Sequence, residues 1–462
     1  MSSFQPNVLW IFADQLRHQA LACNGDPNSR TPNLDRIAAE GTVCETAVSQ
    51  YPVCMPFRAG LMTGQYAHVH GLRVHGDLLA PGCRTVAHAY RAAGYRTSYV
   101  GKLHLASTNS HWFSGDEYWV HPRMRAGFED FSGFDISNHY YNTHYCTGEV
   151  CRGIALEGHQ TDGLTDLSLA YLAEHALPSG RPWFHVIAYE APHPGGGNGQ
   201  NRFDPFPSPP EYEAQFDPDR LALRPNVPEP RDEKVRRCAA GYYAMLAQLD
   251  HNVGRILDLL AGAGQLDNTL VVVLSDHGEM LGSQGRFHKE TAYDEAVRIP
   301  LIFRLPGTVP AGRRFDEGVV SGVDIFPTCA GLCGVRPFPD VQGLDLSAAV
   351  CGRPGPRRSE ALIQWLGATR YGWGDYPYRA IRTATHTYCV SAADVNERHG
   401  GHYRLLFDNV ADPYQQSNLF GLPAARALQR ELHATLCRTV LASAEPLPDF
   451  VADLSAELGD TA

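Results

Sequence analysis

The sequence predicts an α/β fold in which a large, mostly parallel sheet lies between layers of helices, with a smaller C-terminal antiparallel-sheet subdomain. Through most of the chain, apolar runs alternate with helical patterns, which is typical of parallel α/β units. Near residue 352 the composition changes to a Pro/Arg-rich link, and alternating segments follow it. We therefore expect a larger α/β domain over residues 1–355 and a smaller α+β subdomain over residues 356–462.

The N-terminal elements follow the strand, loop and helix order of such a domain. The continuous apolar run at 8–13 predicts a buried strand. The segment 31–41 predicts a helix, because it opens with Thr-Pro and closes at a glycine. A second helix ends at Gly94, and a short strand follows it through 99–100.

The middle of the chain repeats this order. An apolar strand is expected at 183–189, and the Gly/Pro-rich stretch 195–230 predicts a long surface loop or lid. Leucines, valine and isoleucine at helical spacing predict a helix over 233–260, which leads into a β-branched strand that ends before Asp276. Another helix is expected near 323–332.

The last hundred residues have a different pattern. The segments YRAIRTATHTYCVS and YRLLFDN alternate apolar and polar residues and predict a small antiparallel sheet. A closing helix is expected near 425–442.

Composition narrows the class of protein. The 462 residues carry a formal charge of −11, with 44% hydrophobic and 19% charged residues, which excludes a disordered chain and disfavours nucleic acid or anionic lipid as partner. No stretch approaches the ~20 apolar residues of a membrane span, and no secretory signal pattern is present. We therefore expect a cytoplasmic protein without a membrane partner. The 12 cysteines lack framework spacing, so most should be buried thiols.

One regularity points to a functional site. Polar side chains follow four of the predicted strands, and in a parallel sheet such positions meet at one edge, where ligands bind. The residues concerned are Asp14, Gln15, Lys102, His104, His193, Asp276 and His277. Each alone is equally typical of a helix cap, a turn or a solvated surface position.

The polar residues that follow two of these strands could together form a metal site. Asp14, Gln15, Asp276 and His277 supply three oxygen ligands and one imidazole. The oxygen donors favour a hard divalent ion such as Ca²⁺, Mg²⁺ or Mn²⁺ over structural zinc.

Cys54 is a candidate nucleophile. It lies at the predicted start of a helix that can end at Gly64, where a thiol is exposed to the positive end of the helix dipole. Arg58 adds positive charge one turn on, so the pattern indicates an anion pocket that contains a nucleophile. The alternative is a buried structural cysteine.

The stretch CMPFR at 54–58 has the C-x-P-x-R pattern and resembles the type I sulfatases of the alkaline phosphatase superfamily. Further blocks resemble the same family in the same order across nearly the whole chain; they are PNVLWIFADQ, TPNLDRIAAEG, AGLMTGQYAHVHG, GYRTSYVGKLHL, APHP, LVVVLSDHGEMLG, KETAYDEAVRIPLI and FDNVADPYQQSNL. An ordered set of blocks is far more specific than one motif. The resemblance implies an alkaline phosphatase-like fold and hydrolysis of a small sulfated substrate.

The resemblance also implies a role for each candidate residue. Cys54 would be oxidised to formylglycine by a maturase, and its hydrated form would be the nucleophile. One divalent metal, Ca²⁺ first and Mn²⁺ or Mg²⁺ as alternatives, would be held by Asp14, Gln15, modified Cys54, Asp276 and His277. Arg58 would steady the hydrate, and Lys102 and His104 would contact it and the substrate oxygens, with His104 also serving as the base that releases sulfate. The transferring group and the leaving oxygen would be bound by His193 and Lys289.

Two other functions remain open at this point. The neutral amide of Gln15, where many sulfatases carry an acid, is similar to the phosphonate monoester and phosphodiester hydrolases of the same superfamily. A non-catalytic binding protein on the same scaffold is the other alternative. The identity of the sulfated alcohol and the formation of an oligomer are also left open.

Overall fold

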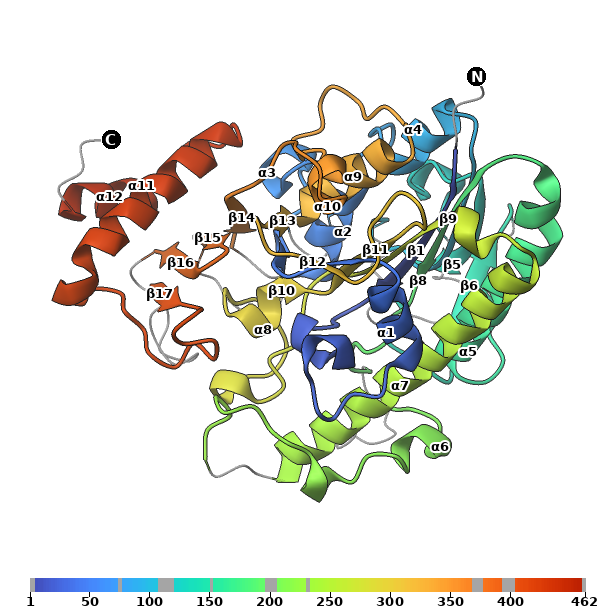
Figure 1. Ribbon diagram of the computed structural model, residues 1–462, viewed down its shortest axis with the longest axis horizontal. Helices are drawn as coiled ribbons and strands as arrows, with labels where there is room; N and C mark the ends of the chain where they lie inside the picture. The colour runs from blue at the N-terminus through green and yellow to red at the C-terminus, as the bar shows by residue number, and fades with distance from the viewer. Residues whose placement is uncertain are drawn as a thin grey trace.

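A computed structural model describes residues 5–73, 77–106, 120–149, 153–195, 206–229, 233–367, 377–392 and 404–458. Within these residues a large mixed sheet forms the centre of the molecule (Figure 1). Its strands, in spatial order, are β12 (Arg313–Phe315), β2 (Thr42–Cys44), β11 (Leu301–Arg304), β9 (Thr269–Ser275), β1 (Asn7–Ala13), β8 (Trp183–Ala188), β4 (Arg96–Lys102), β5 (Asp130–Phe134), β6 (His144–Thr147) and β7 (Ile154–Ala155).

The middle of this sheet is parallel, as the sequence predicts. Strands β9, β1, β8, β4 and β5 pair in parallel, whereas β11 and β6 join them in antiparallel orientation. The carboxyl ends of β1, β9, β8 and β4 therefore lie at the same edge, and this edge carries the candidate residues.

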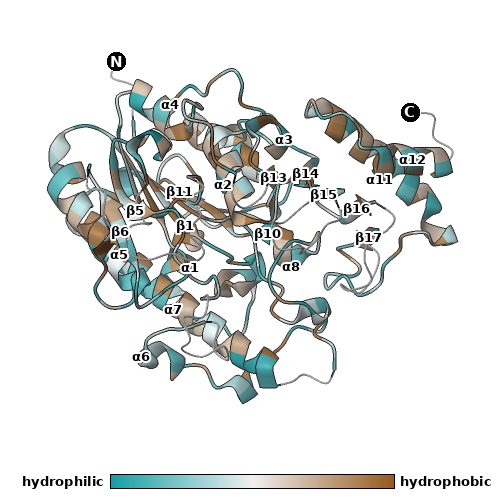
Figure 2. Ribbon diagram, turned by 180° about the vertical axis from the view of Figure 1, so that it is seen from behind, coloured by the Kyte–Doolittle hydropathy of each residue, from teal (hydrophilic) through white to brown (hydrophobic). Residues whose placement is uncertain are grey.

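Helices cover both faces of the sheet. One face packs on α1 (Pro32–Ala39), α5 (Gln160–Tyr171) and α7 (Glu233–Gly262), and the other on α2 (Cys54–Thr63), α4 (Val86–Ala92), α9 (Ile325–Leu332) and α10 (Ser347–Val350). Alternate residues of β1 serve the two cores: Trp10 faces the second group of helices and Ile11 the first. Both sides of the strand are thus buried, which explains its continuous apolar run. Figure 2 shows hydrophobic residues gathered along these central strands.

A second, antiparallel sheet forms near the C-terminus. It consists of β14 (Glu360–Trp365), β15 (Tyr378–Thr383), β16 (His386–Ser391) and β17 (Leu405–Asp408). Helices α11 (Arg426–Ala442) and α12 (Asp449–Leu458) cover one face, and the other face shares a core with Tyr51 and Met280 of the main body. The predicted small sheet and closing helix are confirmed, and the boundary at residue 355 stays a prediction.

Shorter elements lie between the longer ones. They include β3 (Ala47–Val48), β10 (Arg298–Ile299) and β13 (Val320–Ser321), which form a small sheet, and the helices α3 (Ala67–His70), α6 (Pro210–Glu213) and α8 (Asp294–Val297). The stretch 195–230 was expected to be a long surface loop or lid, and its described part contains the one-turn helix α6, whose first turn is favoured by Pro210. The rest of that stretch, at 196–205 and 230, lies outside the described residues.

Two general expectations can be compared with the structure. Each of the eleven described cysteines is a free thiol, and eight of them are buried. Across the described ranges, every helix is too short or too polar to span a lipid bilayer.

Candidate active site

The site is assembled at the carboxyl edge of the central sheet. Asp14 and Gln15 follow β1, and Asp276 and His277 follow its parallel neighbour β9. The two turns are tied together, because the Gln15 N–H donates to Asp276 Oδ1 at 2.9 Å. Gln15 adopts the left-handed region with φ of 66°, which turns the chain sharply at the end of β1.

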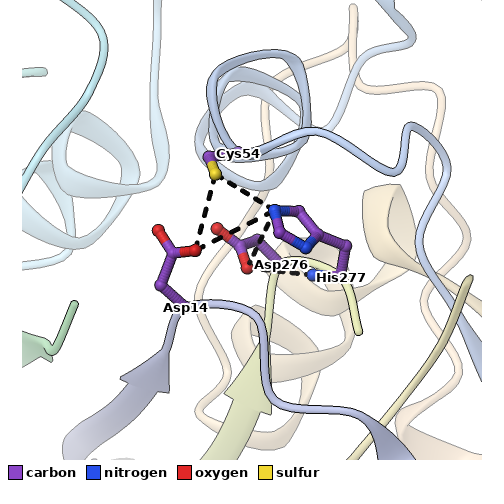
Figure 3. Close-up of side chains that lie close together, drawn as sticks. All are labelled: Asp14, Cys54, Asp276 and His277. Carbon is purple, nitrogen blue, oxygen red and sulfur yellow. Dashed lines mark hydrogen bonds and ion pairs between the residues drawn. The ribbon is translucent and has the colours of Figure 1, made fainter. Parts of the chain in front are cut away.

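Four buried side chains form a cluster at this edge. The ligand atoms of Asp14, Cys54, Asp276 and His277 all lie within 4.8 Å of one another, and each residue is buried (Figure 3). Cys54 Sγ lies 3.0 Å from His277 Nε2 and 3.4 Å from Asp14 Oδ1. Residues from two strand ends and one helix start thus converge as the sequence predicts.

The orientation of His277 suits a metal ligand. Its Nδ1 lies 3.1 Å from the Gly278 carbonyl oxygen, which can only accept, so Nδ1 carries the proton and Nε2 presents its lone pair to the cluster. Burial and then the charge of Lys289 lower the pKa of His277 well below its usual range. The ring is therefore neutral and available for coordination.

Arg58 holds the two carboxylates of the cluster. Its guanidinium lies 3.0 Å from Asp14 Oδ2 and 3.3 Å from Asp276 Oδ2, and it stacks over the Phe12 ring at 4.4 Å. Its Nη1 also donates to the Lys102 carbonyl oxygen at 2.7 Å. All of these contacts are completely buried, so they fix the guanidinium in one position.

The pKa values of the two carboxyl groups are shifted in opposite directions. Burial alone would raise the pKa of Asp14, but Lys102, His193 and Arg58 together lower it well below its usual range. Burial and the charge of Asp14 raise the pKa of Asp276. Two carboxyl groups this close in a buried site favour a cation between them.

Lys102 is the second cation of the site. At the end of β4, its Nζ lies 2.8 Å from Asp14 Oδ2 and 3.2 Å from Glu190 Oε1. Burial would lower the pKa of Lys102, but Asp14 and Glu190 raise it above its usual range. The side chain is therefore protonated.

Lys289 approaches the cluster from another segment. Its Nζ donates to Gln15 Oε1 at 2.5 Å and lies 3.7 Å from Cys54 Sγ. It thus touches both a predicted metal ligand and the predicted nucleophile. The role of Lys289 in binding the transferring group stays a prediction.

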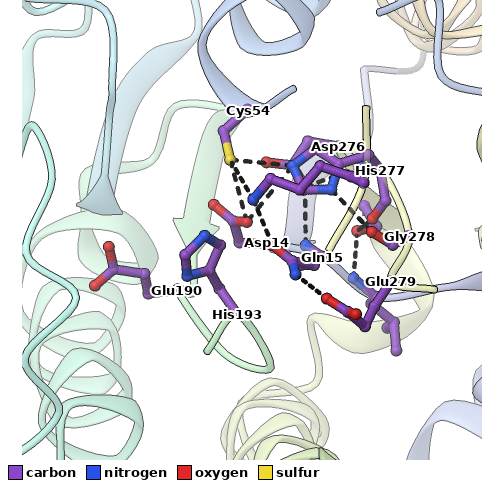
Figure 4. Close-up of polar contacts among 12 residues, drawn as sticks. Asp14, Gln15, Cys54, Glu190, His193, Asp276, His277, Gly278 and Glu279 are labelled. Carbon is purple, nitrogen blue, oxygen red and sulfur yellow. Dashed lines mark hydrogen bonds and ion pairs between the residues drawn. The ribbon is translucent and has the colours of Figure 1, made fainter. Parts of the chain in front are cut away.

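The two predicted histidines have different surroundings. His193 lies beside Asp14 (Figure 4), and burial and then Lys289 lower its pKa well below the usual range. Its Nδ1 contacts the Pro194 carbonyl oxygen at 2.8 Å. His104 follows β4, is buried, and adopts a left-handed backbone with φ of 53°; its N–H donates to the Asp135 carbonyl oxygen. The catalytic roles of both stay predictions.

The thiol of Cys54 has a raised pKa. The helix start and Arg58 were expected to create positive surroundings for it, but burial and the charge of Asp14 raise the pKa of Cys54 to about 12. The nucleophile in an anion pocket stays a prediction. The local sequence pattern does not include Asp14, which reaches the thiol from a different strand. As a cysteine, this side chain is a neutral thiol and a weak nucleophile.

The sequence analysis missed two buried carboxylates. Glu190 directly follows the strand run that ends at Tyr189, so the same strand-end rule could have found it. It accepts from Lys102, from two backbone N–H groups and from Gln160. Glu279 accepts a hydrogen bond from Gln15 Nε2, and no local pattern pointed to it.

Comparison with known proteins identifies the family. Residues 6–335 match the family model described as Sulfatase, and residues 282–441 match that described as N-sulphoglucosamine sulphohydrolase, C-terminal. The ulvan-active sulfatase of Formosa agariphila is 32% identical over 434 residues, which cover 94% of this chain and 80% of that protein. The choline-sulfatase of Rhizobium meliloti is 28% identical, covering 94% of this chain and 86% of that protein.

Solved structures agree with this assignment. A Bacteroides fragilis protein described as a sulfatase superposes with a TM-score of 0.83 at 25% identity, covering 98% of both chains. A phosphonate monoester hydrolase from Silicibacter pomeroyi superposes with a TM-score of 0.74 at 25% identity, covering 95% of this chain and 96% of that one. With a family match over most of its length and curated sulfatases as relatives, the chain belongs to the sulfatase family and is a sulfuric ester hydrolase.

Proposed function

We propose that this enzyme hydrolyses a sulfate ester to an alcohol and sulfate, using formylglycine at position 54 and one divalent metal ion. The observation that carries the proposal is the position of Cys54. Its Sγ lies at the start of α2, within 3.4 Å of both a carboxylate oxygen and an imidazole nitrogen of a candidate metal site. A neutral thiol there has little use as a nucleophile, whereas an oxidised, hydrated side chain would present hydroxyls to the same groups.

The residues present fit a hard divalent cation. Asp14 and Asp276 offer carboxylate oxygens, Gln15 a carbonyl oxygen, and His277 a neutral imidazole with its Nε2 directed into the cluster. Charge supports the same conclusion. Among the described groups in contact there, four carboxyl groups face three cationic side chains. With all four ionised, as metal coordination requires, a negatively charged sulfate ester would be repelled without a further cation. We propose Ca²⁺ first, with Mn²⁺ and Mg²⁺ as alternatives.

The bound metal would polarise the sulfate oxygens and the nucleophile. Formylglycine would supply two geminal hydroxyls, one to attack sulfur and one whose deprotonation expels sulfate and restores the aldehyde. Side chains of this protein would bind the sulfate oxygens and transfer the protons.

Lys102 and Lys289 would bind sulfate oxygens, and Arg58 would keep the site's carboxylates ionised and in place. We propose that His193 and Lys289 bind the transferring group and help the leaving alcohol oxygen to depart. His104 would take the proton of the second hydroxyl.

The substrate is proposed by class only. Relatives are named for ulvan, N-acetylglucosamine 6-O-sulfate and choline sulfate hydrolysis. Two of these three act on saccharides, so we propose a sulfated saccharide as the first substrate to test. Hydrolysis of a phosphonate monoester is the second candidate, favoured by the neutral Gln15 and by the phosphonate monoester hydrolase structure.

The first experiment is the mass of the tryptic peptide 37–58 from protein made in its native host. Cys44 lies in the same peptide and is the control for ordinary thiol chemistry. We expect formylglycine at position 54 and an intact thiol at position 44. An intact thiol at both positions would overturn the proposed nucleophile and favour a binding protein on this scaffold.

Substrate class is tested next with two aryl esters that differ only in the transferring group. A higher kcat/KM on the sulfate supports the proposal, and a higher value on the phosphonate supports the second candidate.

A further inference from the structure

The side-chain amide of Gln15 has a distinct partner on each of its two atoms. Oε1 accepts from Lys289 Nζ at 2.5 Å, and Nε2 donates to Glu279 Oε2. Figure 4 shows Glu279 on the side of Gln15 away from Cys54. The two ends of the amide therefore face opposite sides of the site.

Glu279 is itself fixed by its own loop. Its Oε1 accepts from the backbone N–H of His288 at 2.6 Å and of Leu281 at 3.0 Å. The Met280 N–H donates to the His288 carbonyl oxygen at 2.8 Å and closes the same loop. Glu279 is 1% exposed, so water does not replace these partners. One carboxylate oxygen is thus occupied by two donors, and the other is held towards Gln15.

This arrangement determines which way the Gln15 amide points. An amide has donors only on nitrogen and acceptors only on oxygen, so nitrogen must face the Glu279 carboxylate. The carbonyl oxygen then faces Lys289, whose Nζ also lies 3.7 Å from Cys54 Sγ of the cluster. The reverse orientation would place two acceptors together at Glu279 and two donors together at Lys289, which costs both hydrogen bonds in a buried site.

We propose that Glu279 is a positioning residue that keeps the carbonyl oxygen of Gln15 directed at the metal. This inference rests on the proposed function, in which Gln15 is a metal ligand. A carboxylate at position 279 requires an amide at position 15, since two carboxylates facing each other there would repel. Gln15 and Glu279 therefore act as one unit.

The experiment measures Ca²⁺ affinity of the chelator-treated full-length protein by calorimetry, with no substrate present. In E279Q the two backbone donors still require an oxygen acceptor, so the introduced NH₂ must face Gln15. The Gln15 amide then turns and presents its own NH₂ to the metal. We expect Ca²⁺ affinity to fall about 10- to 100-fold, the usual range for loss of such an outer contact.

Exchange of the two side chains provides the decisive comparison. Q15E alone places two carboxylates against each other and should not bind Ca²⁺ as tightly as the wild type. The double variant Q15E/E279Q restores a donor–acceptor pair and directs a carboxylate oxygen at the metal. We expect it to bind at least tenfold more tightly than Q15E, and this comparison holds even where E279Q fails to fold.

The matched control is E295Q. Glu295 is also 1% exposed, but its carboxylate contacts Arg224 and Asn226 rather than the cluster. We expect wild-type Ca²⁺ affinity for this variant. If the wild type binds no divalent ion, the proposed metal site is wrong. If the wild type binds Ca²⁺ and E279Q binds it equally, or Q15E/E279Q binds no better than Q15E, the role of Glu279 is wrong.

Discussion

Replacement of Glu190 by glutamine should destabilise the protein through Lys102. Lys102 Nζ contacts Asp14 at 2.8 Å and Glu190 at 3.2 Å, and all three side chains are inaccessible to solvent. The Glu190→Gln change removes the charge, and because the Ser137 N–H donates to Oε1 and the Asn138 N–H to Oε2, it keeps an oxygen acceptor for only one of them. The change therefore keeps the shape of the side chain but removes both its charge and one acceptor, and a double-mutant cycle isolates the part that acts through Lys102.

The expected magnitude follows from the distances. At 3.2 Å and an effective dielectric constant of about 20, the attraction between Lys102 and Glu190 is about 5 kcal/mol. Glutamine avoids part of the desolvation penalty of the carboxylate, and Lys102 retains Asp14 as a partner. We therefore expect a loss of about 3 kcal/mol, at the lower end of the values for breaking a buried ion pair.

The assay is a double-mutant cycle. The free energy of unfolding is measured in urea by tryptophan fluorescence, with the metal chelated. If Glu190 acts through Lys102, Glu190→Gln and Lys102→Met together should cost about 2 kcal/mol less than the sum of the single changes. Glu129→Gln is the control, because Glu129 is partly exposed and lies 3.9 Å from Arg181, so its loss should be close to zero. Single losses that add to within about 0.5 kcal/mol would refute the reasoning.

Three further predictions concern acid stability, the metal site and the packing of β4. Burial lowers the pKa of His185 to about 3 in the folded protein, whereas in the unfolded state this histidine is protonated below about pH 6.5. Stability should therefore fall as pH drops from about 6.5 towards 3, by up to about 1.4 kcal/mol per pH unit. His185→Asn should reduce this slope in urea titrations at several pH values, and the exposed His251→Asn should leave it unchanged. Asp276→Ala should abolish turnover and also the increase in Tm produced by Ca²⁺; full turnover without bound metal would contradict the site assignment. Gly101→Ala should destabilise the fold by more than about 3 kcal/mol, because φ at Gly101 is +103° and a Cβ would lie 2.1 Å from a carbonyl oxygen of β8. Gly262 has open space around it, so the control Gly262→Ala should change Tm little.

The strand-end rule explains why most of the site could be predicted from sequence. Apolar runs identify the buried strands, and parallel pairing brings their carboxyl ends to one edge, so Asp14 and Asp276 were expected together although they are far apart in sequence. Glu190 obeys the same rule but was not predicted. Glu279 obeys no local rule, since its partner Gln15 lies 264 residues away.

The fold was predictable to a similar degree. Helical periodicity and capping residues predicted α1, α4 and α7 close to their observed bounds. The direction of β11 was not predictable, because an apolar run buried on both faces has the same pattern in parallel and antiparallel pairing. Helix α12 was also missed, and its apolar face becomes informative only once the small sheet that it covers is known.

The two missed carboxylates show how the site separates positioning from chemistry. Glu190 holds the ammonium group of Lys102, and Glu279 holds the amide of Gln15. In both cases backbone N–H groups fix the carboxylate, so the rigidity of a loop is transmitted to a side chain that reaches the cluster. A buried carboxylate with only acceptor atoms selects which partner atom faces it, and so determines which atom the partner presents to the site. For this reason replacement of either glutamate by the uncharged glutamine should disturb the geometry of the site even where the protein remains folded.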